Sequence, residues 1–272
     1  MRDEFGDRMK EYEAMETGRT LLPLLPVAAR IDGRAFHTFT KRFNKPFDED
    51  LHGAFVYATD QLLRESGAVI GYTQSDEISL ILYQENPKSQ IFFDGKLYKL
   101  TSVLASIATA AFNEFLGKSL AVPLVKPATF DCRVWQLPTK YEAVNVLLWR
   151  EKDARRNSVS AAAQAHYSNK ELHGKSSDEQ QEMLFQKGVN WADYPKWVKT
   201  GAFYRKQTVE RELCPDDFAA IPEQHRPPAG SKVLRTDVVE WPYELSKVVN
   251  KEEAIFDNAP PVFNSASAAT QQ

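Results

Sequence analysis

The sequence predicts an α+β fold built on a ferredoxin-like β-α-β-β-α-β unit, followed by a helical and β-ribbon elaboration. Short β-rich runs alternate with segments of helical apolar spacing between about residues 26 and 136. The two middle runs are separated only by Gln74-Ser75-Asp76, as in a hairpin. The chain has 272 residues, of which 43% are hydrophobic, so it can bury a sizeable core.

Each element of this unit has a local signal. The apolar run 27–31 is the first strand, and Asp48-Glu49-Asp50 caps a helix with apolar residues at positions 51, 55, 58 and 62. The hairpin strands cover 68–73 and 77–83. A second amphipathic helix begins at Leu97 and closes near Gly117, and residues 129–136 form the last strand.

The second half of the chain has weaker signals. A helical pattern extends from Tyr141 to about Tyr167, and the polar stretch from Ser176 marks another helix start. The runs 202–210 and 232–240 are predicted to pair as a β-ribbon. We therefore expect a core domain over 1–137 and an elaboration over 138–257. The tail 258–272 is rich in Ala, Ser, Pro and Gln and is predicted to be disordered.

Carboxylates follow the strands at points that the topology brings together. Asp32 ends the first strand, whereas Asp76 and Glu77 lie at the hairpin turn. A right-handed crossover makes strands one and two parallel and places strand three between them, so these acids should meet at one sheet edge. Such carboxylates can share two Mg²⁺ ions about 3.5–4 Å apart, and Gly33 allows a backbone carbonyl to approach the metal. The pattern predicts a palm-like metal site for phosphoryl chemistry.

Composition limits the partners and the compartment. The net charge of −3 provides no global field for polyanions, so any nucleic-acid binding depends on local clusters. Cys132 and Cys214 have no ligand spacing, which argues against a disulfide framework and structural zinc and favours a reducing, cytoplasmic setting. Because no apolar run approaches the roughly 18 residues of a membrane span, we expect neither secretion nor membrane insertion.

Several cationic motifs leave two interpretations open. The triplets 117–119 and 174–176 read Gly-Lys-Ser, but Phe112 and Asn169 stand where a P-loop requires its first glycine, so we reject that motif. Lys96 and Lys99 either form a solvated face or neutralise a triphosphate. The segment 149–157 places cations and one tryptophan on a helix, where they contact phosphates and bases or simply water.

Three strings carry a resemblance to a known family. They are Arg30-Ile31-Asp32-Gly33-Arg34-Ala35-Phe36-His37, Lys45-Pro46-Phe47-Asp48 and Tyr72-Thr73-Gln74-Ser75-Asp76-Glu77. On these residues the chain resembles tRNA-His guanylyltransferase and the related guanylyltransferase-like 3′–5′ polymerases, from about Tyr12 to Lys206. Together the three strings are far more specific than any one of them.

The resemblance implies a palm catalytic domain over 1–137, with two Mg²⁺ ions held by Asp32, the Gly33 carbonyl and Asp76, and with Glu77 assisting. ATP would activate the tRNA 5′-phosphate, and the 3′-hydroxyl of GTP or another nucleotide would then attack it. The nucleotide contacts it implies are Asp32, Gly33, Arg34, Ala35, Phe36, His37, Lys45, Ser75, Asp76, Lys96 and Lys99. The residues implied in tRNA contact or activation are Arg30, Asp153, Asn157 and Lys199.

The resemblance also implies that residues 138–257 contact tRNA and form a homotetramer, a dimer of dimers. One string departs from the eukaryotic family pattern: Arg155-Arg156-Asn157-Ser158 stands where His-Ile-Asn-Asn is found. Both tRNA-His guanylylation and template-matched repair of truncated tRNA 5′ ends therefore stay open.

Two alternatives use the same fold, namely a palm nucleotide cyclase and a non-catalytic RNA-binding module. The third strand has no Phe or Tyr before Tyr83, which weakens the RNA-binding alternative.

Overall fold

The computed structural model describes residues 3–121, 124, 126–228 and 230–264. Within these ranges six strands form one antiparallel sheet in the order β4-β1-β3-β2-β5-β6. The strands are β1 Val27–Gly33, β2 Ile70–Gln74, β3 Glu77–Leu82, β4 Phe130–Gln136, β5 Ala202–Glu212 and β6 Lys232–Trp241. The helices are α1 Glu4–Thr17, α2 Phe36–Phe39, α3 Glu49–Ser66, α4 Leu97–Ser119, α5 Lys140–Gln164, α6 Asn169–Leu172, α7 Ser177–Gln186, α8 Lys196–Thr200, α9 Pro215–Ala220 and α10 Lys251–Phe256.

The predicted mixture of helices and an antiparallel sheet is confirmed. Strand β3 lies between β1 and β2, and β4 pairs with the other edge of β1, which is the strand pairing of a split βαβ unit. The predicted N-cap is also present, because the Asp48 carboxylate accepts the Leu51 backbone N–H at 3.1 Å. At the other end of α3, Gly67 takes the left-handed conformation with φ 67°.

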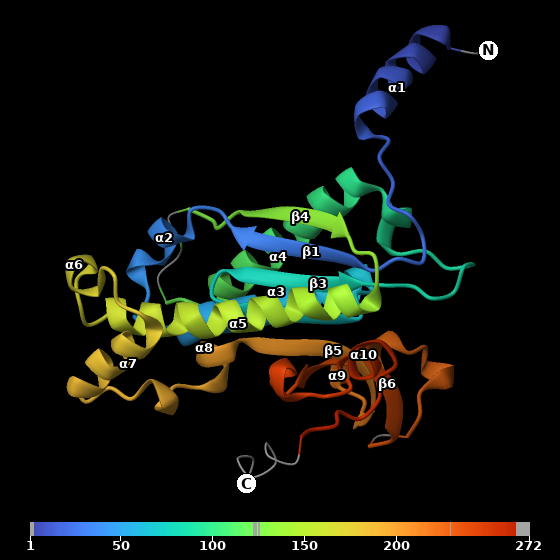
Figure 1. Cartoon of the computed structure of the whole chain (residues 1–272). Coiled ribbons are helices and arrows are strands. Elements are labelled where there is room, and N and C mark those ends of the chain that lie inside the picture. The colour runs from blue at the N-terminus through green and yellow to red at the C-terminus, as the bar shows by residue number, and fades with distance from the viewer. Residues whose placement is uncertain (1–2, 122–123, 125, 229, 265–272) are drawn as a thin grey trace.

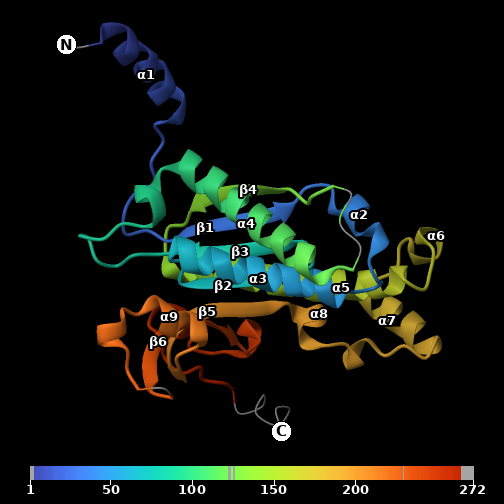
Figure 2. The ribbon, with the colours of Figure 1, turned by 180° about the vertical axis from the view of Figure 1, so that it is seen from behind.

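Helices cover both faces of the sheet (Figures 1 and 2). Helices α3 and α4 lie on one face and pack against apolar residues of β1 and β3. Four aromatic rings form the centre of this layer, with centroid separations of 4.8–5.9 Å: Phe36, Phe55, Phe112 and Phe130. Helix α5 and α10 cover the opposite face. The sheet is thus buried between two apolar layers, except at its edges and ends.

Helix α4 tests the expectation that no segment spans a membrane. In the described part of the chain it alone is long and apolar enough to cross a bilayer by length and composition. It packs against α3 and β4 and buries Leu100, Leu104 and Phe112. This is the position of a core helix, and length and composition alone are weak evidence for a membrane span.

The C-terminal ribbon is confirmed, and it also extends the sheet. Residues 202–204 of β5 pair with β2, and residues 203–212 of β5 pair with β6. Gly201 makes the sharp entry into β5 with φ 71°, and a Cβ there would lie 2.4 Å from the Tyr72 hydroxyl oxygen. That hydroxyl donates to the Thr200 carbonyl at 2.9 Å, so this junction requires glycine.

The predicted disorder of the tail is wrong for its first part. The Val249 N–H donates to the Val262 carbonyl at 2.7 Å, and the Phe263 ring lies 5.3 Å from that of Tyr243. Residues 258–264 are therefore held on the α5 side of the sheet, because Phe263 supplies an apolar anchor. Residues 265–272 lie outside the described residues.

Helix α1 is unlike the other long helices. It extends away from the sheet (Figures 1 and 2), and none of its residues is buried. Its large apolar side chains, including Phe5, Met9 and Tyr12, are exposed.

Candidate active site

The predicted carboxylates come together where β1 ends beside the β2–β3 turn. Asp32 lies opposite Glu77 in the β1–β3 register, and the Gly33 N–H donates to the Asp76 carbonyl at 3.0 Å. Ser75 enters the turn with φ 55°, a left-handed conformation that is costly for a non-glycine residue. The structure therefore brings the three acids to one sheet edge and holds their turn in a strained backbone.

The electrostatics of this edge favour a cation. Burial raises the pKa of Asp76, and the nearby charge of Asp32 raises it further. A divalent ion between the two carboxylates would relieve both effects. Mg²⁺ typically binds one or two carboxylates and completes its octahedron with waters and substrate phosphates. Among the described residues no three or more His, Cys, Asp or Glu side chains are arranged so that they could hold one metal ion together, but Asp32 and Asp76 fit that smaller donor set.

Glu77 has a different environment from the two aspartates. Nε of Arg150 lies 2.6 Å from its Oε1, and Nη2 of Arg150 donates to its Oε2 at 3.1 Å. Nε of Arg30 lies 3.6 Å from Oε2. Burial raises the pKa of Glu77, whereas both arginines act against this shift. Because two guanidinium groups already neutralise this carboxylate, it supports the turn rather than offering a vacant ligand.

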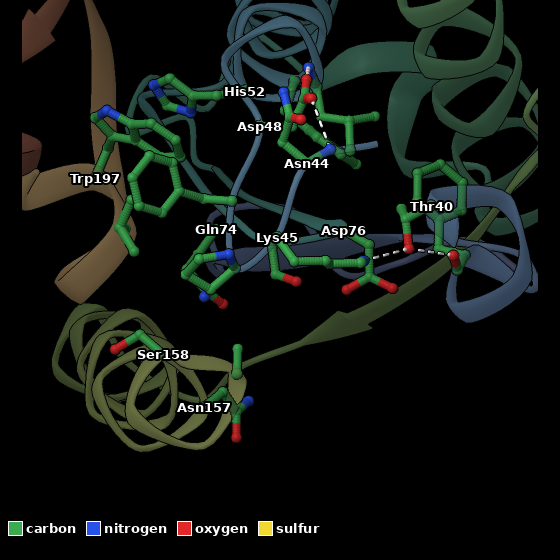
Figure 3. A pocket seen from close by; sticks show the side chains of 18 of the residues that line it. Thr40, Asn44, Lys45, Asp48, His52, Gln74, Asp76, Asn157, Ser158 and Trp197 are labelled. Atoms are coloured by element: carbon green, nitrogen blue, oxygen red, sulfur yellow. Dashed lines mark hydrogen bonds between the residues drawn. The ribbon is translucent and has the colours of Figure 1, made fainter. Parts of the chain in front are cut away.

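A cavity of about 310 Å³ opens beside the turn (Figure 3). Its walls come from the segment 36–48, the first turns of α3, the hairpin turn, α5 and α8. Inside it, Nζ of Lys45 donates to the Thr40 hydroxyl at 3.3 Å. The cavity thus combines a cation, the Asp76 carboxylate and an apolar wall, as ligand sites do.

Aromatic rings form that apolar wall. The Phe47 and Trp197 centroids are 5.3 Å apart, and His52 stacks on Trp197 with centroids 3.9 Å apart and planes 8° from parallel. Burial lowers the pKa of His52 to about 4, so its imidazole is neutral near pH 7. An uncharged aromatic wall is suited to a flat, apolar ligand group.

Five of the eleven predicted nucleotide contacts line this cavity. They are Phe36, His37, Lys45, Ser75 and Asp76, and Asn157, which was predicted as a tRNA or activation residue, lines the cavity as well. Arg34 and Ala35 do not line it: the Arg34 N–H donates to the Thr129 carbonyl, and Ala35 starts α2 with φ 57°.

The predicted tRNA or activation residues lie on neighbouring elements. Asp153 accepts a hydrogen bond from Nη1 of Arg150 at 3.1 Å, and its carboxylate also contacts Arg156. The Lys199 ammonium lies 5.8 Å from the Trp191 ring centroid and is not part of the cavity wall.

Lys96 and Lys99 are not brought to the site. Lys96 forms an isolated bridge with Thr20, and the Lys99 ammonium lies 5.7 Å from the Phe93 ring centroid. Both lie at the start of α4, beyond the end of β3 that is remote from the hairpin turn (Figure 1). Their expected position beside the triphosphate is therefore not supported within this chain.

Sequence reasoning missed Thr40, Asn44, His52, Ser158 and Trp197 in the cavity wall. Position was the only signal for Thr40 and Asn44, which lie between two of the strings that carry the resemblance. Trp197 and His52 belong to elements far apart in sequence, so neither residue spacing nor periodicity connects them.

Comparisons with known proteins show what the chain is similar to. A family model described as tRNAHis guanylyltransferase matches residues 6–138. A bacterial tRNA(His) guanylyltransferase-like protein, solved in complex with ATP, is 40% identical with a TM-score of 0.70, covering 75% of this chain and 87% of that one. A structure of a bacterial protein of the same description, in complex with GTP, is 34% identical with a TM-score of 0.68, covering 88% and 91%. The tRNA(His) guanylyltransferase of Schizosaccharomyces pombe is 29% identical over 223 residues, covering 77% of this chain and 83% of that protein.

Proposed function

The chain belongs to the tRNAHis guanylyltransferase family, and from this premise we propose that it is a nucleotidyltransferase that adds GMP or template-matched nucleotides to the 5′ end of tRNA. In the first step an oxygen of the RNA 5′-phosphate attacks the α-phosphorus of ATP and releases pyrophosphate. In the second, the 3′-hydroxyl of GTP or another nucleotide attacks the activated 5′-phosphorus and releases AMP. The RNA therefore grows in the 3′–5′ direction.

One observation carries this proposal: the Asp32–Asp76 pair adjoins a nucleotide-sized cavity. We assign the binding of two Mg²⁺ ions to Asp32, Asp76 and the Gly33 carbonyl. When bound, these ions would neutralise phosphate charge and lower the pKa of an attacking hydroxyl. Glu77 keeps the turn in place through its arginine pairs.

The cavity provides the remaining nucleotide contacts. Lys45 reaches the same region as Asp76, where its ammonium can contact phosphate oxygens (Figure 3). The Phe47 and Trp197 rings offer an apolar surface to a base or ribose. Asn157 lines the α5 side and can donate a hydrogen bond to the nucleotide.

The finer features of the fold and assembly are proposals as well. Strand order β4-β1-β3-β2 supports a polymerase-like palm over residues 1–137, and residues 138–257 are assigned to tRNA contact and subunit association as a dimer of dimers. The two free cysteines are consistent with a reducing compartment such as the cytoplasm.

An RNA extension assay tests this function. RNAs with a 5′-monophosphate are incubated with ATP, GTP and Mg²⁺, comparing tRNA-His that lacks its extra 5′ guanosine with a tRNA that lacks its first paired nucleotide. Asp76→Asn should reduce extension by at least about 100-fold. Asp178→Asn, an exposed carboxylate on α7, is the matched control and should extend RNA normally.

Each outcome distinguishes a defined alternative. Faster extension of the truncated tRNA would identify 5′-end repair, and faster extension of tRNA-His would identify guanylylation. A cyclic nucleotide product without RNA extension would identify a cyclase. Full extension by Asp76→Asn would contradict the assignment of the metal ligand.

A further inference from the structure

We propose that the exposed indole of Trp149 on α5 stacks against a nucleobase at the acceptor end of the RNA substrate. This inference rests on the proposed function, and it adds a defined RNA contact to the proposed site. The Trp149 side chain is 49% exposed although it lies beside the most tightly ion-paired part of the site. Large aromatic rings left in water near a reaction centre are candidates for substrate contact.

The ring is held in place by two arginines. The guanidinium carbon of Arg150 lies 4.7 Å from the centroid of the Trp149 ring, and that of Arg30 lies 5.8 Å from it. The side chains of Arg150 and Arg30 are only 11% and 18% exposed, because both are paired with Glu77. An indole that contacts two mostly buried guanidinium groups loses little conformational freedom on binding.

The indole also lies next to the proposed reaction centre. Arg30 precedes Asp32 by two residues on β1, so both side chains project from the same face of the sheet. Glu77, which pairs with Arg30 and Arg150, lies opposite Asp32 in the register. Trp149 therefore contacts β1 directly through Arg30, two residues before the proposed metal ligand Asp32.

The nucleotide cavity and the indole are separate places on α5. Asn157 lines the cavity, whereas Trp149 lies eight residues earlier, about 12 Å along the helix axis, and does not line it. A nucleotide in the cavity thus leaves the indole accessible to the second reactant, which is the RNA end.

Burial favours the indole ring over the two adjacent guanidinium groups as the surface that an RNA group contacts. Glu77 pairs with both Arg30 and Arg150, and Asp153 pairs with both Arg150 and Arg156, so each of these guanidinium groups already has a carboxylate partner. Arg30 and Arg150 are much less exposed than the Trp149 ring that they contact, and every nucleobase has a π-face to stack on that ring. This contact does not require one base identity, so it fits a surface that accepts an RNA end rather than one that reads its sequence.

Binding measurements with two variants test the inference. A 3′-labelled tRNA with a 5′-monophosphate is titrated with protein in Mg²⁺ without nucleotide, and fluorescence anisotropy gives the Kd. Trp149→Ala should weaken RNA binding about 5- to 150-fold, the range expected for one lost stacking contact. Trp149→Phe, which keeps an aromatic ring, should restore most of the affinity. Tyr141→Ala, an exposed aromatic of the same helix, is the matched control and should bind like the wild type.

Two further readings separate stacking from other roles. RNA should quench tryptophan emission more in the wild type than in Trp149→Phe. This comparison does not use Trp149→Ala, so it tests the inference even if that variant does not fold. The Kd for GTP should be the same in both variants and the wild type, because the ring lies outside the cavity.

Unchanged RNA affinity in Trp149→Ala would overturn the inference, as would a loss of GTP binding with normal RNA binding. A change in oligomeric mass in both variants would also overturn it, by assigning the ring to a contact between subunits. If the wild type binds RNA through Trp149 but extends neither tRNA, the proposed function fails and the stacking contact stands.

Discussion

Replacing Arg150 with methionine should destabilise the protein by about 3 kcal/mol at pH 7.5. Arg150 pairs with Glu77 and Asp153, and its side chain is 11% exposed, against 14% for Glu77. Removing one partner of a buried pair costs about 3–5 kcal/mol, because the other charge stays buried without compensation. The lower end of this energy range applies here, since in the variant Arg30 remains 3.6 Å from Glu77 and Asp153 still contacts Arg156.

The loss should depend on pH in a defined direction. Burial already raises the pKa of Glu77, and without Arg150 it rises further. A carboxyl with a raised pKa in the folded state contributes stability that is fully present below its unfolded pKa, about 4.3, and is lost as pH rises through its folded pKa. Arg150→Met should therefore approach wild-type stability near pH 4.5 and diverge from it as the pH is raised.

Urea denaturation of the wild type, Arg150→Met, Glu77→Gln and the double variant measures this effect. The double-mutant cycle should give a coupling free energy of about 2 kcal/mol between the two positions. A loss within about 0.5 kcal/mol of zero at both pH values would refute the reasoning, as would additive effects of the two substitutions.

Three other substitutions test separate parts of the structure. Asp76→Asn should raise the free energy of unfolding by about 1 kcal/mol in EDTA at pH 7.5, because it removes a buried charge next to Asp32. Mg²⁺ should no longer stabilise this variant, and a melting temperature that still depends on Mg²⁺ would argue for other metal ligands. Gly201→Ala should cost about 2 kcal/mol or more in urea denaturation, because φ is 71° and the new Cβ would meet the Tyr72 hydroxyl; a neutral result would mean that the junction relaxes easily. Phe112→Ala should lower the free energy of unfolding by about 3–5 kcal/mol by calorimetry, since its ring is fully buried at the centre of the aromatic cluster. A smaller loss would indicate that the neighbouring rings move into the space that the deleted ring leaves.

The meeting of Asp32 with the acids of the hairpin turn was predictable because it depends on the order and topology of the strands. Once residues 27–33, 70–74 and 77–82 are strands joined by a crossover and a hairpin, Asp32 must lie beside the turn. The cavity wall was not predictable in the same way. It requires α8 to pack against the first turn of α3, and the stacking of His52 on Trp197 depends on packing between distant segments rather than on local sequence.

The placement of Lys96 and Lys99 shows why a role inferred only from the sequence position of a residue within a family can fail. Strand β3 starts at the turn and leads away from it, so whatever follows β3 begins at the opposite end of the sheet. The pairing of β5 with β2 also escaped prediction, because nothing in the run 202–210 specifies a second neighbour besides β6. β5 pairs with β2 because β2 would otherwise be the edge strand of the sheet, with unpaired backbone groups.

Helix α1 has a thermodynamic consequence that its sequence position hides. Its 14 residues bury no side chain against the rest of the chain, and isolated helices shorter than about 12–15 residues are marginal in water because nucleation is costly. The segment should therefore interconvert between helix and coil as long as no other surface covers it, and its backbone amide hydrogens should exchange with solvent within seconds. Persistent protection of those amide hydrogens would mean that another surface covers Phe5, Met9 and Tyr12. Hydrogen exchange in this segment therefore reports whether the helix is in contact with another molecule.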